Sequence, residues 1–400
     1  MSDNLPDTLP AAEWTQRSDL ARLVEALGAD NLRWVGGAVR DTLLNAPVRD
    51  VDAATPLLPE AVMEACAKAD IRTVPTGIDH GTVTAILPGG PVEITTLRHD
   101  VSTDGRRATI SFAQHWREDA ARRDFTINAL YAHPGTLEIS DYFGGLADLQ
   151  ARRVRFIGDA RQRIREDHLR ILRYFRFQAR FGAQLDEEAE EACAELAATM
   201  KGLSRERVAG ELLALLSLPR PGATIERMSS LGVLPVILPE AGPAQVQTLA
   251  QLIETEQADQ TSPDGLRRLA ALLPAAPEIA KTVAVRLRLS RAQRERLACA
   301  AARGPSDIEQ PRALAYREGL ECARDRLLLQ GAPTAPLKGW EVPRLPLKGG
   351  EIVARGIGAG PEVARILRAV EDRWVAEGFP PRSRVEALLD EALENPQGRG

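Results

Sequence analysis

The stretch VGGAVRDTLLNAPVRDVDAAT (residues 35–55) decides the fold of the N-terminal part of the chain. It starts at the end of an apolar, strand-like run and passes through Gly36 and Gly37 into a short apolar helix. Asn45 is typical of a residue that ends a helix in the left-handed conformation. A second strand follows over residues 49–54, so the pattern predicts a strand, a helix and a strand around one glycine turn.

Two aspartates one residue apart occupy the second strand. Asp50 and Asp52 project from the same face, because side chains alternate along a strand. Two carboxylates this close repel each other unless a cation neutralises them, and Mg²⁺ prefers oxygen ligands. Glu93 lies in another strand-like run, PVEITT, and would complete a two-metal site for in-line phosphoryl displacement if the two strands are neighbours. A lone Asp-x-Asp is more often a pair of solvated acids.

The residues before the aspartates strengthen the metal interpretation. Gly36 and Gly37 at a strand-to-helix turn allow backbone amides to approach a phosphate, and the helix N-terminus adds partial positive charge. Arg40 falls in the first turn of the helix and could reach the same anion. A Gly-Gly pair alone is usually just a tight turn, but glycines, an arginine and paired acids together favour a phosphate and metal site.

Composition sets the limits for the whole chain. With 400 residues, 44% hydrophobic and 27% charged, the sequence predicts two to four compact units. A net charge of -5 argues against a uniformly basic nucleic-acid coat. Charge is nevertheless segregated, since residues 151–182 hold ten arginines and only three acids. This segment is a candidate for binding a polyanion.

The four cysteines are scattered without metal-like spacing. We therefore expect neither a disulfide framework nor a structural zinc, and a reducing compartment. The N-terminal residues lack the pattern of a targeting segment, and no apolar run reaches the length of a membrane span. The sequence thus predicts a cytoplasmic protein with no membrane partner.

Strand and helix patterns alternate up to about residue 150. Residues 81–97 predict a hairpin around Pro-Gly-Gly, and residues 98–119 predict a long functional loop. Helical patterns then dominate, at 160–181, 186–200, 204–217, 222–230, 243–256, 264–273, 290–302 and 311–329. The expected fold class is α+β multidomain, with an N-terminal mixed β-sheet followed by all-α parts.

Several motifs in order resemble the nucleotidyltransferase superfamily, and specifically the class II tRNA nucleotidyltransferases, or CCA-adding enzymes. The 35–55 stretch is similar to the first motif of that family, and VEITTLR (92–98) is similar to its third-carboxylate strand. The others are DGRR (104–107) for the flexible loop, RRDFTINAL (122–130) for the second motif, DYFGGLADL (141–149) for the hinge, EDHLRILRYFRF (166–177) for nucleobase reading and LSRERVAGELLALL (203–216) for the motif that closes the neck. The resemblance is weaker beyond residue 217.

This resemblance implies a catalytic nucleotidyltransferase head (1–150), a helical neck that recognises the nucleobase (151–217), a helical body (218–330) and a tRNA-binding tail (331–400). It places Asp50 and Asp52 at metal-binding positions and Glu93 at the third carboxylate. It implies nucleotide contacts for Gly36, Gly37, Arg40, Arg123, Asp124, Asn128, Asp167, Arg170, Arg173 and Arg176. Asp124 would lie near the ribose 2′-hydroxyl, and Arg123 at a phosphate, although either could pair within the domain. Loop arginines 106 and 107 would couple the switch from CTP to ATP to growth of the RNA end.

Asp167 and Arg170 stand three residues apart in a helical pattern and should share a face. A carboxylate only accepts hydrogen bonds and a guanidinium only donates them. Cytosine and adenine both present an amine donor beside a ring-nitrogen acceptor, whereas uracil and guanine present the reverse order. The pair would therefore select CTP and ATP against UTP and GTP without a nucleic-acid template. Arg173 and Arg176 continue the stripe toward the triphosphate.

The sequence thus predicts template-independent addition of C, C and A to the 3′ end of tRNA from CTP and ATP, with two Mg²⁺ ions and release of pyrophosphate. The tRNA would lie along the helical part, held by backbone charge and shape. GIGAGP (356–361) could add amides for an RNA phosphate, or be a plain helix start. The alternatives are a bacterial poly(A) polymerase, an enzyme that adds only A or only CC, and a non-enzymatic RNA-binding protein.

Overall fold

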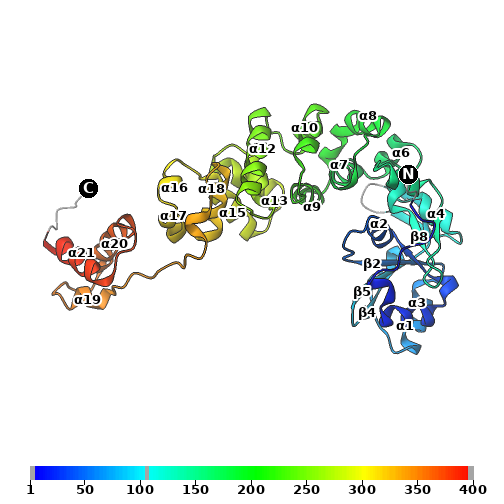
Figure 1. Ribbon diagram of the computed structural model, residues 1–400, viewed down its shortest axis with the longest axis horizontal. Helices are drawn as coiled ribbons and strands as arrows, with labels where there is room; N and C mark the ends of the chain where they lie inside the picture. Colours follow the sequence, from blue (N-terminus) through cyan, green and yellow to red (C-terminus); the bar gives the residue numbers. More distant parts are fainter. Residues whose placement is uncertain (1–4, 104–107, 395–400) are drawn as a thin grey trace. The chain divides into compact units, whose positions relative to one another are not determined.

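The computed structural model describes the backbone of residues 5–103 and 108–394. Within these ranges it describes the side chains of all residues except 100–110. The chain divides into two compact units, Met1–Pro239 and Glu240–Gly400. Figure 1 shows the described strands in the N-terminal unit and helices in both units. The expected α+β class with a mixed sheet followed by helices is confirmed. The division into head, neck, body and tail stays a prediction.

A mixed sheet forms the core of the N-terminal region. Within the described residues it has seven strands in the order β3-β4-β5-β2-β1-β8-β9. Its strands are β1 (Arg33–Val35), β2 (Val51–Thr55), β3 (Arg72–Gly77), β4 (Thr82–Leu87), β5 (Gly90–Thr96), β8 (Leu130–Ala132) and β9 (Ile139–Asp141). Strands β2 and β5 are parallel, and the other neighbours are antiparallel. This parallel pair matters most for the site.

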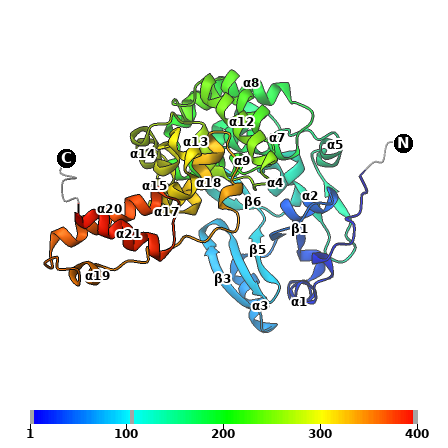
Figure 2. The same ribbon diagram turned by 60° about the vertical axis from the view of Figure 1, so that its left-hand side comes forward.

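The predicted strand, helix and strand around the glycine turn are confirmed. Helix α2 (Gly37–Leu43) follows β1, and Asn45 has a φ of 52°, the left-handed conformation expected after a helix end. Helix α3 (Pro59–Lys68) begins with a proline at its first position, where no backbone donor is lost, and contacts β3 and β4. Figure 2 shows α3 beside β3, and helix α1 (Ser18–Leu27) packs against α3.

The hairpin predicted at 81–97 is confirmed as β4 and β5. The expectation of a loop over 98–119 is wrong. That segment forms a separate antiparallel pair, β6 (Arg98–Thr103) and β7 (Ala108–Phe112), followed by helix α4 (Trp116–Ala121). The polar residues hid these strands, because pairing in a two-stranded ribbon needs no buried face. Loop residues 104–107, with arginines 106 and 107, lie outside the described residues.

The helical pattern at 160–181 is not one helix. Helix α6 (Ala160–Glu166) ends before Asp167, whose backbone is extended with φ -151° and ψ 104°, and α7 (Arg170–Phe181) begins three residues later. The expected shared helical face of Asp167 and Arg170 is therefore wrong, because the pattern continues through the break and gives no sign of it. Helices α5 (Gly145–Gln150), α8 (Glu187–Leu196), α9 (Arg205–Leu216), α10 (Gly222–Ser230) and α11 (Val233–Ile237) complete this unit.

The second unit is helical in its described residues. It contains α12 (Pro243–Ala258), α13 (Gly265–Ala271), α14 (Pro277–Arg286), α15 (Arg291–Ala301), α16 (Ser306–Glu309), α17 (Pro311–Glu318), α18 (Leu320–Leu329), α19 (Gly349–Val353), α20 (Pro361–Ala376) and α21 (Arg382–Glu394). The single helix expected at 311–329 is split at Gly319, which has a φ of 87°. Helices α19 to α21 pack around the buried Trp374.

The expectation of no disulfide is contradicted at one place. Cys299 on α15 and Cys322 on α18 form a disulfide, while Cys66 and Cys193 are buried and free. Spacing along the chain gave no sign of this bond because the pairing depends on how the two helices pack. In the part of the chain that the structure describes, no helix is long and apolar enough to cross a membrane.

Candidate active site

Two of the three predicted carboxylates lie on neighbouring strands, and the third lies next to one of these strands. Asp52 on β2 and Glu93 on β5 are register partners in the parallel pair, so their side chains leave the same face of the sheet. Asp50, which we expected within the strand, lies one residue before β2 begins. Val51, Val92 and Ile94 are buried on the opposite face. The strand adjacency on which the metal interpretation depended is therefore present.

The three acids act on one another electrostatically. Burial raises the pKa of Asp52, the charges of Glu93 and Asp50 raise it further, and Arg123 opposes them. Among the described residues, none of the three carboxylates has an ion-pair or hydrogen-bond partner. In the described structure, the carboxylate oxygens of these three residues do not all lie within 4.8 Å of one another. Three unpaired, mutually repelling carboxylates nevertheless fit a divalent cation.

A cleft of about 710 Å³ opens beside Asp50 and Asp52. All ten residues predicted to contact the nucleotide line it, whereas Glu93 is not part of its lining. Its described lining holds seven arginines against four carboxylates, and this excess of positive charge favours an anion. The lining residues are Gly36, Gly37, Arg40, Asp50, Asp52, Arg122, Arg123, Asp124, Asn128, Asp167, Arg170, Arg173, Arg176, Phe177 and Arg180.

The glycine turn forms one wall of this cleft. Gly36 has a φ of 69°, a conformation that disfavours any side chain, and its amide donates to the Leu130 carbonyl at 3.2 Å. A Cβ atom there would lie 3.5 Å from Nη1 of Arg123 and 3.6 Å from the carbonyl oxygen of Asn128. The backbone conformation, rather than crowding, explains the glycine.

Arg40 is only 4% exposed although it lines the cleft. Its Nε donates to Asp41 at 2.8 Å and its Nη1 donates to Asn128 at 2.5 Å. The guanidinium also lies 4.3 Å from the ring centroid of Phe181 on α7. Burial lowers the pKa of Arg40, and the neighbouring Asp41 carboxylate opposes this shift. Arg40 is therefore held in one orientation by both α2 and α7.

Asp124, expected near the ribose, pairs within the chain. Its Oδ2 accepts from Arg173 Nε at 2.8 Å and Nη2 at 2.5 Å, and its Oδ1 accepts from Asn128 at 3.1 Å. Burial raises the pKa of Asp124, but Arg173 and Asn128 outweigh that effect and hold the pKa below its ordinary value. Asp124 thus joins the sheet region to α7.

Asp167 and Arg170 both face the cleft but hold other partners. Asp167 Oδ2 accepts from Arg207 Nη2 of α9 at 2.6 Å. Arg170 donates to Glu166 at 2.7 Å and to the Arg122 carbonyl at 3.1 Å. The predicted acceptor and donor therefore both line the cleft, and each is oriented by its own counter-charge.

Three cleft residues were missed by sequence reasoning: Arg122, Phe177 and Arg180. Arg180 continues the stripe of Arg173 and Arg176 along the same helix, and that spacing could have found it. Phe177 lies under both stripe arginines, with guanidinium carbons 5.6 and 4.7 Å from its ring centroid.

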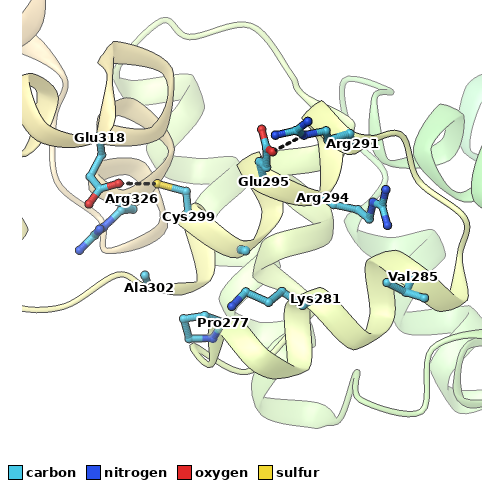
Figure 3. Close-up of a pocket in the computed structure, with 11 residues that line it drawn as sticks. Pro277, Lys281, Val285, Arg291, Arg294, Glu295, Cys299, Ala302, Glu318 and Arg326 are labelled. Atoms are coloured by element: carbon cyan, nitrogen blue, oxygen red, sulfur yellow. Dashed lines mark hydrogen bonds and ion pairs between the residues drawn. The ribbon is translucent and has the colours of Figure 1, made fainter.

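A second cleft, of about 620 Å³, lies in the C-terminal unit (Figure 3). Its lining comes from α14, α15, α17 and α18 and includes Lys281, Arg294, Cys299 and Glu318. Arg291 pairs with Glu295 at 2.8 Å within this wall, and Cys299 Sγ lies 3.6 Å from Glu318. None of the predicted site residues belongs to it.

The chain matches known families and proteins over most of its length. Residues 32–155 match the family described as Poly A polymerase head domain, and residues 182–245 match the family described as Probable RNA and SrmB- binding site of polymerase A. Mitochondrial CCA tRNA nucleotidyltransferase 1 of Mus musculus is 35% identical over 395 residues, covering 92% of this chain and 88% of that protein. A CCA-adding enzyme of Leuconostoc citreum is 40% identical over 211 residues, 52% of this chain and 51% of that protein.

Solved structures show the same architecture. The Bacillus stearothermophilus CCA-adding enzyme in complex with CTP has a TM-score of 0.77 at 26% identity, covering 96% of this chain and 98% of that chain. The Thermotoga maritima CCA-adding enzyme complexed with tRNA_CCA has a TM-score of 0.70 at 22% identity, covering 94% and 95%, and shows the fold alone.

The head-domain match, together with carboxylates at the edge of an arginine-lined cleft, makes this chain a nucleotidyltransferase. Identity at the level of the mouse relative, across nearly all of both chains, narrows the class further. The chain belongs to the family of CCA tRNA nucleotidyltransferases, or CCA-adding enzymes.

Proposed function

We propose that this chain adds C, C and A to the 3′ end of tRNA, using CTP and ATP without a nucleic-acid template. The single observation that carries the proposal is the cleft in which Asp52, paired in register with Glu93, faces the arginines of α7. The relatives named as CCA-adding enzymes support it, as does a fold neighbour bound to CTP.

In this proposal Asp50, Asp52 and Glu93 would hold two Mg²⁺ ions. When bound, the ions stabilise negative charge on the attacking and leaving oxygens. The terminal 3′-hydroxyl of the RNA loses its proton to solvent, and its oxygen bonds to the α-phosphorus. The bond from the α-phosphorus to the oxygen that bridges to the β-phosphate breaks, so pyrophosphate leaves. Arg123 and Arg176 bind the phosphates and orient them for in-line attack.

Base selection is assigned to Asp167 and Arg170. The Asp167 carboxylate accepts from the exocyclic amine of cytosine or adenine, and the Arg170 guanidinium donates to the adjacent ring nitrogen. UTP and GTP present a carbonyl to the acceptor and an N-H to the donor, so both contacts become repulsive. Asp124 is bound to Arg173, so sugar selection by Asp124 requires that ion pair to open.

We assign tRNA binding to the helical parts, and the four divisions of the chain keep the roles predicted from sequence. The six arginines between 151 and 182 that do not line the cleft provide charge for the RNA backbone. The fold neighbour complexed with tRNA_CCA supports this assignment. A cytoplasmic location stays a prediction.

The test incubates the purified chain with transcripts that lack CCA, CA or A, each with a single nucleoside triphosphate, and sequences the products. We expect C, C and A in order and no incorporation of U or G. Incorporation of A alone on the last transcript would instead identify an A-adding enzyme.

A poly(A) polymerase is the second candidate, because the matched head-domain family carries that name. It predicts oligo(A) tails on RNAs unrelated to tRNA. The same assay with an unstructured RNA as primer separates the two activities, since a CCA-adding enzyme leaves that RNA unextended.

A further inference from the structure

Six of the seven described cleft arginines are held in pairs by three carboxylates that do not line the cleft. We propose that Asp41, Asp119 and Glu211 are positioning residues that aim these guanidinium groups at the triphosphate. The inference rests on the proposed nucleotide-binding function of the cleft and adds to it the groups that organise the phosphate site from outside.

Asp119 on α4 holds Arg122 and Arg123. It is 1% exposed. Its Oδ1 accepts from Arg122 at 2.8 Å, while its Oδ2 accepts from Arg123 at 3.2 Å and from the Tyr131 hydroxyl at 2.6 Å. Burial raises the pKa of Asp119, but Arg123 and Arg122 outweigh that effect and hold the pKa below its ordinary value, so the group is anionic at neutral pH.

Glu211 on α9 holds the two arginines of the α7 stripe. Its Oε2 accepts from Arg176 at 2.5 Å, and its Oε1 lies 3.7 Å from Arg173 Nη1. Arg173 also pairs with Asp124, so its guanidinium is fixed on two sides. In this proposal Arg173 and Arg176 supply the positive charge with which helix α7 faces the phosphates.

Asp41 on α2 holds Arg40 and Arg180. Its Oδ1 accepts from Arg40 at 2.8 Å, and its Oδ2 accepts from Arg180 at 3.1 Å. The two arginines are separated by 140 residues in the sequence and come from different helices. Asp41 therefore sets the position of α7 relative to the glycine turn.

Like charges explain why such carboxylates are needed. Seven guanidinium groups around one cleft repel each other and would turn toward solvent when no nucleotide is bound. A carboxylate behind each pair offsets that repulsion and fixes the direction of each planar guanidinium fork. Less of the binding free energy is then spent on ordering the arginine side chains when the ligand binds.

The test uses the full chain with Asp119→Asn and Glu211→Gln, which keep side-chain shape but remove charge. Binding of inorganic tripolyphosphate and of CMP is measured by calorimetry, and kcat and KM for CTP are measured on a transcript lacking CCA. We expect the affinity for tripolyphosphate to fall by about 10-fold or more, because arginines that are no longer held in place make poorer contacts with the phosphates. The affinity for CMP should change by less than about 2-fold, because the contacts to the base remain.

Asp307→Asn is the matched control. Asp307 is as buried as Asp119 and holds Arg326 at 2.5 Å, but neither residue lines the nucleotide cleft. This variant should lower the unfolding temperature without weakening tripolyphosphate binding. If Asp119→Asn does not fold, Glu211→Gln decides, since its side chain is partly exposed.

Two results would overturn the inference. One is unchanged tripolyphosphate affinity in both variants, and the other is an equal loss of tripolyphosphate and CMP affinity, which indicates a merely structural role. Failure of the proposed function is recognised separately, because the wild-type chain would then add no nucleotide to tRNA while the calorimetric comparison still reads the phosphate site.

Discussion

Asp167 accepts a hydrogen bond at 2.6 Å from Arg207, which belongs to helix α9. Within the described structure Asp167 makes no ion pair with Arg170, which pairs with Glu166 instead. The acceptor and the donor proposed to read the nucleobase are thus held by separate partners. Arg207 orients the Asp167 carboxylate, and Glu166 orients the Arg170 guanidinium. Each can therefore be altered without removing the other.

Replacing Asp167 with Ala should relax nucleotide choice. The acceptor for the exocyclic amine is lost, so the preference for CTP over UTP in kcat/KM should fall by about 100-fold. Competition assays with equal CTP and UTP on a transcript lacking CCA measure this ratio. Arg165→Ala, on the exposed side of α6, serves as the control and should leave the ratio unchanged. An unchanged ratio in the Asp167 variant would remove this residue from base selection.

Removing the charge of Asp52 should stop catalysis while tRNA still binds. Asp52→Asn takes away the carboxylate shared by the proposed ions, and a loss of several kcal/mol in transition-state stabilisation corresponds to about 1,000-fold or more in kcat. EDTA should have the same effect on the wild-type chain, with recovery on adding Mg²⁺. Filter binding of tRNA should change by less than about 2-fold. Activity in EDTA would contradict the metal assignment.

The conformation of the glycine turn predicts a sharp contrast between two glycines. Gly36→Ala forces a side chain into a φ of 69° and should destabilise the chain by about 1 kcal/mol, with loss of nucleotide affinity. Gly210 lies inside helix α9 with open space around its Cβ position, so Gly210→Ala should stabilise by about 0.5–1 kcal/mol. Thermal unfolding compares the two. Equal effects would show that backbone conformation is not what selects Gly36.

Asp19 should give a measurable acid dependence of stability. The Arg17 hydrogen bond, opposed by burial and aided by the Gly89 amide, lowers the pKa of Asp19 from 3.8 to about 2. A depressed folded pKa means that the stabilisation is fully present above pH 3.8 and is lost as the pH falls toward 2. Asp19→Asn should therefore lower the free energy of unfolding at pH 7 but not near pH 2, as chemical denaturation would show. A difference that persists at pH 2 would contradict this linkage.

Local patterns in the sequence predicted the elements that carry the candidate site, whereas the pairing of β2 with β5 came from the structure. The glycine turn, the two strand aspartates and the hairpin bearing Glu93 each follow from alternation, backbone freedom and turn residues that lie within a few positions of one another. The arginine stripe of α7 follows from helical spacing in the same way. These properties depend on neighbouring residues, so the sequence determined them by itself.

Tertiary structure alone decided which charges pair between residues far apart in the sequence. Asp167 takes Arg207, Arg180 takes Asp41, and Cys299 joins Cys322, although nothing in the spacing of these residues indicates a partner. The break between α6 and α7 was likewise hidden, because an apolar periodicity can continue through a turn. Ion pairs and disulfides form between groups that packing brings within a few ångströms, and that proximity is set by the whole fold rather than by sequence distance.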